Sequence, residues 1–146
     1  MCGCGKRGHW EAYSAGTGIE NYVEEQIAAD PELGKSFSNP SPRTPEIAEA
    51  AKKGDPLAKA AFERAGYFLG IGVSNYLHIF NPSCVVFGGG VTQTGDLIFA
   101  PFHKSLSEHV INERYIQNLK IGLAELGDNA GLTGCAEFLR DQLQVV

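Results

Sequence analysis

The sequence has no apolar run long enough to cross a bilayer, and its start, Met-Cys-Gly-Cys-Gly-Lys, lacks the apolar stretch of a signal peptide. We therefore expect a cytoplasmic protein with no membrane role, in which the four cysteines stay reduced. Basic residues are also few, because the chain has 12 Lys and Arg, scattered along its length, and a net charge of -5. A nucleic-acid surface needs clustered basic residues, so none is expected on this chain.

Two common catalytic motifs are missing as well. The run 88–94, Gly-Gly-Gly-Val-Thr-Gln-Thr, does not end in the Gly-Lys-Ser/Thr of a Walker loop, so a nucleotide there would be held differently. No HExxH pattern supplies a base beside a helical metal site. There is no internal repeat and no low-complexity tail. At 146 residues, 43% of them hydrophobic, the chain is predicted to form a single domain, residues 1–146, with its own core.

Hydrophobic residues recur at helical spacing in most of the chain. In the longest such segment, Asp55 and Pro56 form a typical helix start and Asn81-Pro82 a typical end. Its inward stripe is expected to run from Leu57 to Ile79 and Phe80. The segment 33–44, in which Gly34, Pro40 and Pro42 stand among serines and Asn39, is expected to be a loop. Helices are predicted over residues 17–27, 45–53, 56–80, 97–111 and 130–143.

Three glycines interrupt the predicted helix 56–80. Gly66, Gly70 and Gly72 each cost about 1 kcal/mol relative to alanine in an exposed helix. Close packing of this helix against another element would explain all three.

Two short runs rich in β-branched residues, 83–87 and 119–124, predict buried strands, each followed by a helix. This order indicates an α/β fold with a parallel layer and right-handed crossovers. Gly88, Gly89 and Gly90 follow the first strand directly. They allow either a ligand to approach the backbone or a tight turn with positive φ, and the pattern alone does not separate the two.

The first eleven residues hold a glycine-rich loop that contains Cys2, Cys4 and His9. Zinc prefers thiolate and imidazole ligands, and it can stabilise a loop that buries little apolar surface, so a structural zinc site is the leading interpretation. Structural zinc takes four ligands, and only three candidates are present. The alternative is a pair of incidental thiols near the terminus. Cys84 and Cys135 have apolar neighbours in sequence and are expected to be small core residues.

Glu11 lies two residues after the last candidate ligand, where a rigid loop would hold its carboxylate in place to accept hydrogen bonds from a polyol. It could instead be a solvated glutamate in the first turn of a helix. His78, His103 and His109 share no ligand spacing, and we assign them no function.

Three strings, CGCGKRGHWEAYSAGTGI, NPSCVVFGGGV and AELGDNAGLTGCAEF, resemble the C-terminal half of the ROK family of repressors and sugar kinases. The GHWEAY string is most similar to glucokinases and hexokinases of the archaeal type. The resemblance implies the C-terminal lobe of an actin-like, ribonuclease-H-like ATPase fold, a mixed sheet with packed helices. Residues 1–16 would form the zinc-loop region, and the N-terminal lobe is expected to be absent.

The resemblance also implies roles for the residues above. Cys2, Cys4 and His9 fall on three zinc-ligand positions, with histidine where cysteine is usual and the family's fourth, upstream ligand absent. Glu11 matches a glutamate that hydrogen-bonds a sugar hydroxyl. Gly88, Gly89 and Gly90 match a turn that lies against the adenosine part of the nucleotide.

The leading hypothesis is therefore the sugar- and nucleotide-contacting lobe of an ATP-dependent hexose kinase, with ATP and Mg²⁺ as cofactor, glucose or a similar hexose as partner, and a homodimer as assembly. Such kinases use an aspartate base and a phosphate turn from the other lobe, so we expect no catalysis by residues 1–146 alone. One alternative is the effector domain of a sugar-responsive repressor. Another is a standalone module that dimerises through the glycine-bearing helix 56–80.

Overall fold

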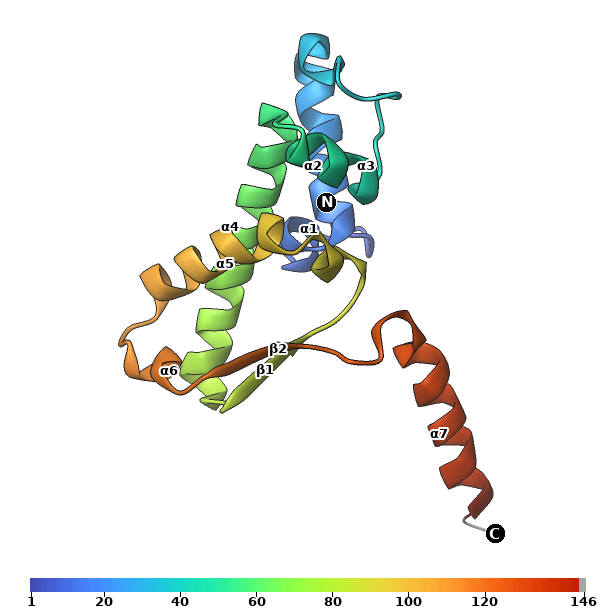
Figure 1. The fold of residues 1–146 in the computed structure, drawn as a ribbon, viewed down its shortest axis with the longest axis vertical. Coiled ribbons are helices and arrows are strands. Elements are labelled where there is room, and N and C mark those ends of the chain that lie inside the picture. The colour runs from blue at the N-terminus through green and yellow to red at the C-terminus, as the bar shows by residue number, and fades with distance from the viewer. Residues whose placement is uncertain (145–146) are drawn as a thin grey trace.

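The computed structural model describes residues 1–144, without the side chains of Asp128 and Gln144. The chain is mostly helical, with two short strands near its centre (Figure 1). In order, the elements are α1 (Glu11–Ser14), α2 (Gly16–Ala29), the 3-10 turn η1 (Pro31–Gly34), α3 (Thr44–Lys52), α4 (Pro56–Phe80), β1 (Cys84–Phe87), η2 (Gly90–Thr94), α5 (Asp96–His109), α6 (Arg114–Gln117), β2 (Lys120–Leu123), η3 (Gly127–Asn129) and α7 (Ala130–Gln144).

Helix α4 has the ends that the sequence predicts. The Asp55 carboxylate accepts a hydrogen bond of 2.8 Å from the Ala58 amide, which satisfies one of the free N–H groups of the first turn. At the other end Asn81 adopts the left-handed conformation, φ 44°, and its amide donates to the Leu77 carbonyl. These two local signals fix the element that the rest of the molecule packs around.

The glycines of α4 allow α5 to cross it at close range. A Cβ on Gly66 would lie 2.7 Å from the Ile98 carbonyl oxygen, and one on Gly70 would lie 2.6 Å from Cβ of Ser105. The Ser105 hydroxyl also donates a 2.7 Å hydrogen bond to the Tyr67 carbonyl oxygen. Two of the three glycines are therefore explained by helix packing, as predicted.

Two hydrophobic clusters form the core, one on each side of this crossing. The first joins α2, α3 and the first half of α4, and Ile19, Ile47 and Phe62 are almost fully buried in it. The second lies between α4, α5 and the strands, and it centres on Leu77 and Phe102. The buried stripe on α4 ends earlier than predicted, because Ile79 and Phe80 are 71% and 67% exposed.

Strands β1 and β2 pair in parallel, with Cys84 opposite Lys120 and Phe87 opposite Leu123. The α/β layer expected from the sequence is therefore present, and its connection runs through α5 and α6. Within residues 1–144 these two strands are the whole sheet, so the mixed sheet expected for the complete fold is not seen in this part of it.

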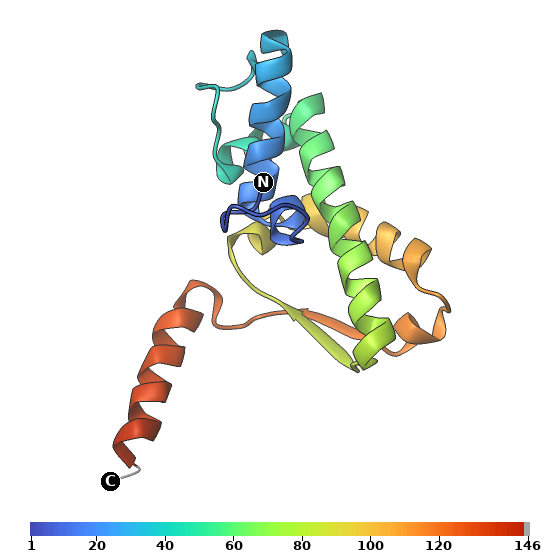
Figure 2. The same cartoon turned by 180° about the vertical axis from the view of Figure 1, so that it is seen from behind.

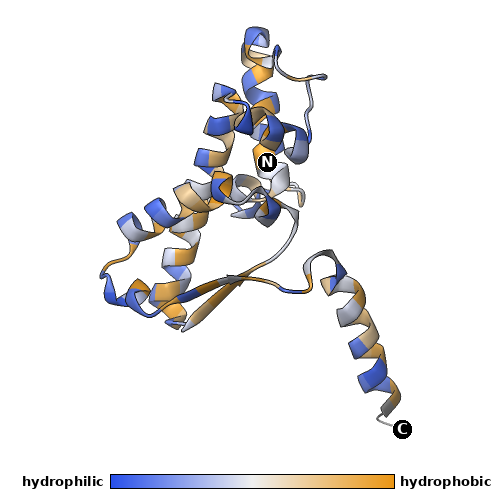
Figure 3. Cartoon of the chain, in the orientation of Figure 1, coloured by the Kyte–Doolittle hydropathy of each residue, from blue (hydrophilic) through white to orange (hydrophobic). Residues whose placement is uncertain are grey.

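Helix α7 projects away from the other helices in both views (Figures 1 and 2). Leu132, Leu139 and Leu143 are each more than half exposed along it. Figure 3 shows hydrophobic and hydrophilic residues alternating around this helix. Within the described residues, no helix has the combination of length and hydrophobicity that a membrane span requires.

Candidate functional site

The N-terminal loop folds back on itself through backbone hydrogen bonds and brings its three candidate ligands together. The Cys2 amide donates to the Lys6 carbonyl and the Gly5 amide donates to the Cys2 carbonyl, both at 2.9 Å. Gly5 and Gly8 take positive φ values of 80° and 83°, which glycine adopts at no steric cost. As a result, Sγ of Cys2 and Cys4 and a ring nitrogen of His9 all lie within 4.8 Å of one another.

Three donors this close together could hold a metal ion, and a tetrahedral zinc site would have one position left for another ligand. The Cys4 sulfur lies 3.2 Å from Nδ1 of His9, close to the separation of two donors bound to one zinc ion. A backbone hydrogen bond at Cys4 lowers the pKa of the Cys2 thiol, but burial and side-chain hydrogen bonds with Cys4 and Glu11 outweigh it, so the pKa lies above its usual value. Without a metal, the loop therefore favours the neutral Cys2 thiol.

Trp10 anchors the loop to the long helix. Its indole Nε1 donates a 2.8 Å hydrogen bond to the Phe68 carbonyl oxygen in the interior of α4. The ring lies where a side chain on Gly72 would otherwise be, which explains the third glycine of the helix. The residue before Glu11 is thus fixed to the body of the molecule.

Glu11 begins the single-turn helix α1, and its side chain is exposed. The Cys2 thiol donates a 3.5 Å hydrogen bond to Oε2 of Glu11, and a Cβ on Gly3 would lie 3.8 Å from Oε1. The carboxylate therefore touches the loop of Cys2, Cys4 and His9 directly. Its position depends on the same loop that gathers the three candidate ligands.

The glycine turn follows the end of β1. Gly89 has φ 95°, a conformation that favours glycine, and Gly90 begins the turn η2. All three glycines are exposed, and a Cβ on Gly89 or Gly90 would have no neighbour within 4 Å. Packing therefore explains little at these two positions, and the turn leaves its backbone open to a ligand.

Glu11 and Gly90 line two adjoining cavities. Both cavities also share Ala15, Gly16 and Val91. The first, which we call the α3-side cavity, has a volume of about 610 Å³ and extends along Thr44, Pro45, Ala48, Glu49 and Lys52. The second, the strand-side cavity, has about 500 Å³ and extends along Trp10, Leu69, Phe87, Gly88 and Gly89. These volumes are in the range of small-molecule sites.

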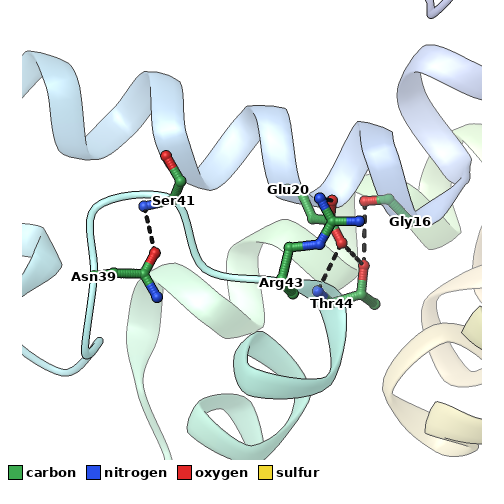
Figure 4. A network of polar contacts seen from close by, with 6 residues as sticks. All are labelled: Gly16, Glu20, Asn39, Ser41, Arg43 and Thr44. Atoms are coloured by element: carbon green, nitrogen blue, oxygen red, sulfur yellow. Dashed lines mark hydrogen bonds and ion pairs between the residues drawn. The ribbon is translucent and has the colours of Figure 1, made fainter.

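The sequence did not reveal a polar network in the wall of the α3-side cavity (Figure 4). Glu20, only 8% exposed, accepts hydrogen bonds of 2.9 Å from both the amide and the hydroxyl of Thr44. Its other oxygen pairs with the Arg43 guanidinium at 3.2 Å. A glutamate in an amphipathic helix usually faces solvent. The burial of Glu20 could have been inferred from the sequence only if position 20 had been assigned to the apolar face of the helix.

The other residues singled out from the sequence lie elsewhere. Cys84 and Cys135 are exposed, so the prediction that they are core residues was wrong: the strand and α7 leave these faces uncovered. His78 accepts a hydrogen bond from the Ile111 amide, and His109 contacts the Ser105 carbonyl. Neither histidine belongs to the cluster of Cys2, Cys4 and His9 or lines either cavity.

Comparison with known proteins gives consistent matches. The chain is 30% identical to the glucokinase of Streptomyces coelicolor over 97% of its own length and 46% of the relative's. It is 32% identical to the xylose repressor of Caldicellulosiruptor bescii over 98% of the chain and 36% of that protein. The crystal structure of a ROK family glucokinase from Streptomyces griseus, in complex with glucose and AMPPNP, superposes with a TM-score of 0.79 and 31% identity, over 94% of this chain and 46% of that one.

The chain spans less than half the length of these relatives. Its fold is that of the ROK sugar kinases, which are actin-like ATPases. Residues 1–142 match the model of the ROK family, so the chain belongs to the ROK family.

Proposed function

We propose that residues 1–146 are the C-terminal lobe of an ATP-dependent hexose kinase of the glucokinase type and that they contact both sugar and nucleotide. The observation that carries the proposal is that Glu11 and Gly90, from distant parts of the chain, line the same two cavities. The glucokinase relatives and the neighbouring structure with glucose and AMPPNP support it.

In this proposal each motif has one task. Glu11 accepts hydrogen bonds from sugar hydroxyls, and the loop of Cys2, Cys4 and His9 keeps its carboxylate in place. Zinc, when bound to that loop, would supply a rigid crosslink. Gly88, Gly89 and Gly90 offer a backbone without side chains to the nucleotide. ATP with Mg²⁺ would be the phosphoryl donor.

We further propose that residues 1–146 do not transfer phosphate by themselves. Among the described residues, the carboxylates that line the two cavities are those of Glu11, Glu20 and Glu49, and Glu49 is paired with Lys52 at 2.7 Å. Glu11 has the task of holding sugar, and Glu20 is bound to Thr44 and Arg43. Loss of a general base alone lowers the rate by roughly 10²–10⁴-fold.

Titration calorimetry of the 146-residue chain tests the binding roles. We expect saturable binding of glucose and, separately, of Mg-ADP, but no ADP release in a coupled assay with ATP, Mg²⁺ and glucose. Absence of both binding events would contradict the proposed lobe, and ordinary kinase turnover would contradict its inactivity. Galactose and GDP serve as ligand controls.

The xylose repressor relative favours a second candidate, the sugar-binding effector domain of a transcriptional repressor. An effector domain needs the sugar but not the nucleotide. Sugar binding with no measurable Mg-ADP binding would therefore favour the repressor, whereas binding of both ligands favours the kinase.

We also propose that the chain assembles as a homodimer. The glycines of α4 do not form this interface, because Gly66 and Gly70 face α5 and Gly72 faces Trp10 of the same chain. A dimerisation module built on that helix face is therefore not supported. Light scattering at several protein concentrations measures the assembly, and a monomer at all of them would contradict the dimer.

A further inference from the structure

The burial of the Glu20 carboxylate is explained neither by sugar binding nor by metal binding. It is a carboxylate in the second turn of α2 that is almost fully buried, and burying a charge is costly unless it is paired and hydrogen-bonded. Three contacts offset that cost. The amide and the hydroxyl of Thr44 donate to Oε1, and the Arg43 guanidinium meets Oε2 (Figure 4).

These contacts hold the start of α3 from outside that helix. Arg43 stands at the N-cap position and makes no side-chain capping bond. The free amide of Thr44, the first residue of α3, is instead satisfied by Glu20 of α2. A negative charge at this end of a helix is also stabilised by the helix dipole.

Gly16 lets the two helices come close enough for this link. A Cβ on Gly16 would lie 2.9 Å from Oγ1 of Thr44 and 3.6 Å from a methyl carbon of Val91. The Thr44 hydroxyl also lies 3.3 Å from the Gly16 carbonyl oxygen. The first turns of α2 and α3 and the turn η2 therefore meet at one point in the cavity wall.

Helix α3 lines only one of the two cavities. Thr44, Pro45 and Ala48 face the α3-side cavity, and no α3 residue lines the strand-side cavity. The turn η2, which begins at the last of the three glycines, lines the same cavity through Val91 and Gln93. A shift of α3 would thus change the width of the α3-side cavity and leave the strand-side cavity unchanged.

We propose that Glu20 is a positioning residue for nucleotide binding: by fixing Thr44 it sets the distance between α3 and the glycine turn, so that the α3-side cavity fits the nucleoside part of a nucleoside diphosphate. This inference rests on the proposed function, because it assumes that a nucleotide occupies that cavity. Glu20 does not touch the reacting atoms. Its effect is on nucleotide affinity and not on sugar affinity.

Four variants of the 146-residue chain test this: Glu20→Ala, Glu20→Gln, Arg43→Ala and, as matched control on the exposed face of α2, Glu25→Ala. Mg-ADP and glucose affinities are measured in parallel by calorimetry, and helix content by circular dichroism. Because a hydrogen bond to a charged group is strong, Glu20→Ala is expected to weaken Mg-ADP binding about tenfold or more and glucose binding less than about twofold.

The conservative variant separates position from charge. The amide oxygen of Glu20→Gln can still accept from Thr44, so this variant is expected to bind Mg-ADP much more tightly than Glu20→Ala. Arg43 is largely exposed, so Arg43→Ala is expected to weaken Mg-ADP binding much less than Glu20→Ala does. If Glu20→Ala loses helix content, Thr44→Val takes its place, because it removes only the hydroxyl bond, and it is expected to weaken Mg-ADP binding selectively.

Each result has a definite meaning. If the wild-type chain does not bind Mg-ADP, the proposed function fails before Glu20 is tested. If the wild type binds and the Glu20→Ala chain, or the Thr44→Val chain in its place, binds equally well, the role of Glu20 is overturned. Equal loss of ADP and glucose affinity would also overturn it, because it would show a general effect on the fold.

Discussion

The indole ring of Trp10 occupies the space beside Gly72, so that a Cβ on Gly72 would lie 2.2 Å from the ring. The same ring donates a hydrogen bond to the Phe68 carbonyl oxygen of α4. In the sequence, Trp10 immediately precedes Glu11. Glu11, the candidate sugar-binding residue, is therefore held next to α4 through the side chain of Trp10.

The Gly72→Ala variant tests this attachment. A methyl group cannot fit at 2.2 Å, so the ring must move, and overpacking of this kind typically costs about 1–3 kcal/mol. The expected result is a lower free energy of unfolding in urea and a red-shifted emission of Trp10, the only tryptophan of the chain. Gly134→Ala in α7, where a Cβ meets no atom within 4 Å, is the control and is expected to leave the emission unchanged.

Metal binding by the N-terminal loop can be measured directly. With Cys2, Cys4 and His9 as donors, we expect close to one zinc ion per chain by mass spectrometry of the metal, and a thiolate-to-cobalt absorption band after replacement by Co²⁺. Cys4→Ser is expected to lower the zinc content, and His9→Cys, which adds a third thiolate to the loop, is expected to raise the zinc affinity. Equal zinc content in the wild-type and Cys4→Ser chains would argue against the site.

Removal of the metal is expected to weaken sugar binding. Zinc would bind Cys2 as a thiolate, which cannot donate to Glu11, so in the metal-bound loop the carboxylate is held by the crosslinked backbone and not by the thiol bond. A loop that loses its crosslink then no longer holds the carboxylate in place. After dialysis against a chelator, glucose affinity measured by calorimetry should fall, and Mg-ADP affinity should change less. Recovery of glucose affinity on adding zinc back would separate this effect from irreversible unfolding.

Glu11→Gln is expected to weaken glucose binding about tenfold, since hydrogen bonds to a charged group are stronger than those to a neutral amide. Its unfolding midpoint should remain close to that of the wild type, because the side chain is exposed. Glu25→Ala, which removes an exposed glutamate outside both cavities, is the matched control. Unchanged glucose affinity in the Glu11→Gln chain would refute its assigned role.

The crossing of α4 and α5 gives a prediction on stability alone. Gly66→Ala would place a methyl group 2.6 Å from a ring carbon of Pro101 and 2.7 Å from the Ile98 carbonyl oxygen. We expect a loss of about 1–3 kcal/mol in the free energy of unfolding. The exposed Gly131→Ala in α7 should show the opposite sign, because alanine favours a helix over glycine by about 1 kcal/mol.

Local signals in the sequence predicted most of the elements. Asp55 and Asn81 set the ends of α4 through contacts within a few residues, and both ends were predicted correctly. The single-turn helix Arg114–Gln117 was missed, and the helix Glu11–Ser14 was expected only as an alternative for Glu11, because four residues are too few to show a helical period. The stripe on α4 was extended to Ile79 and Phe80 because periodicity says which residues share a face but not where the neighbouring element ends.

The candidate site was predictable only where a motif carries it. The cysteine loop, Glu11 and the glycine turn each form a short contiguous string. Glu20 was not found, because its burial depends on Thr44, which the fold brings next to it from a different helix. For the same reason the apolar neighbours of Cys84 in sequence did not predict its exposure: burial depends on what covers the strand.

The parallel pairing of β1 with β2 has a consequence for how the chain acquires its shape. A tight turn cannot join two parallel strands, so residues 88–119 must form the connection between β1 and β2 before the strands can pair. Contacts between residues far apart in sequence form slowly, because loop-closure entropy must be overcome first. Tyr67 and Ser105, which are bonded across α4 and α5, are 38 residues apart, about as far as the paired residues of the two strands. We therefore expect the helix crossing and the strand pair to form at a similar stage of folding, together with the glycine turn that leaves β1.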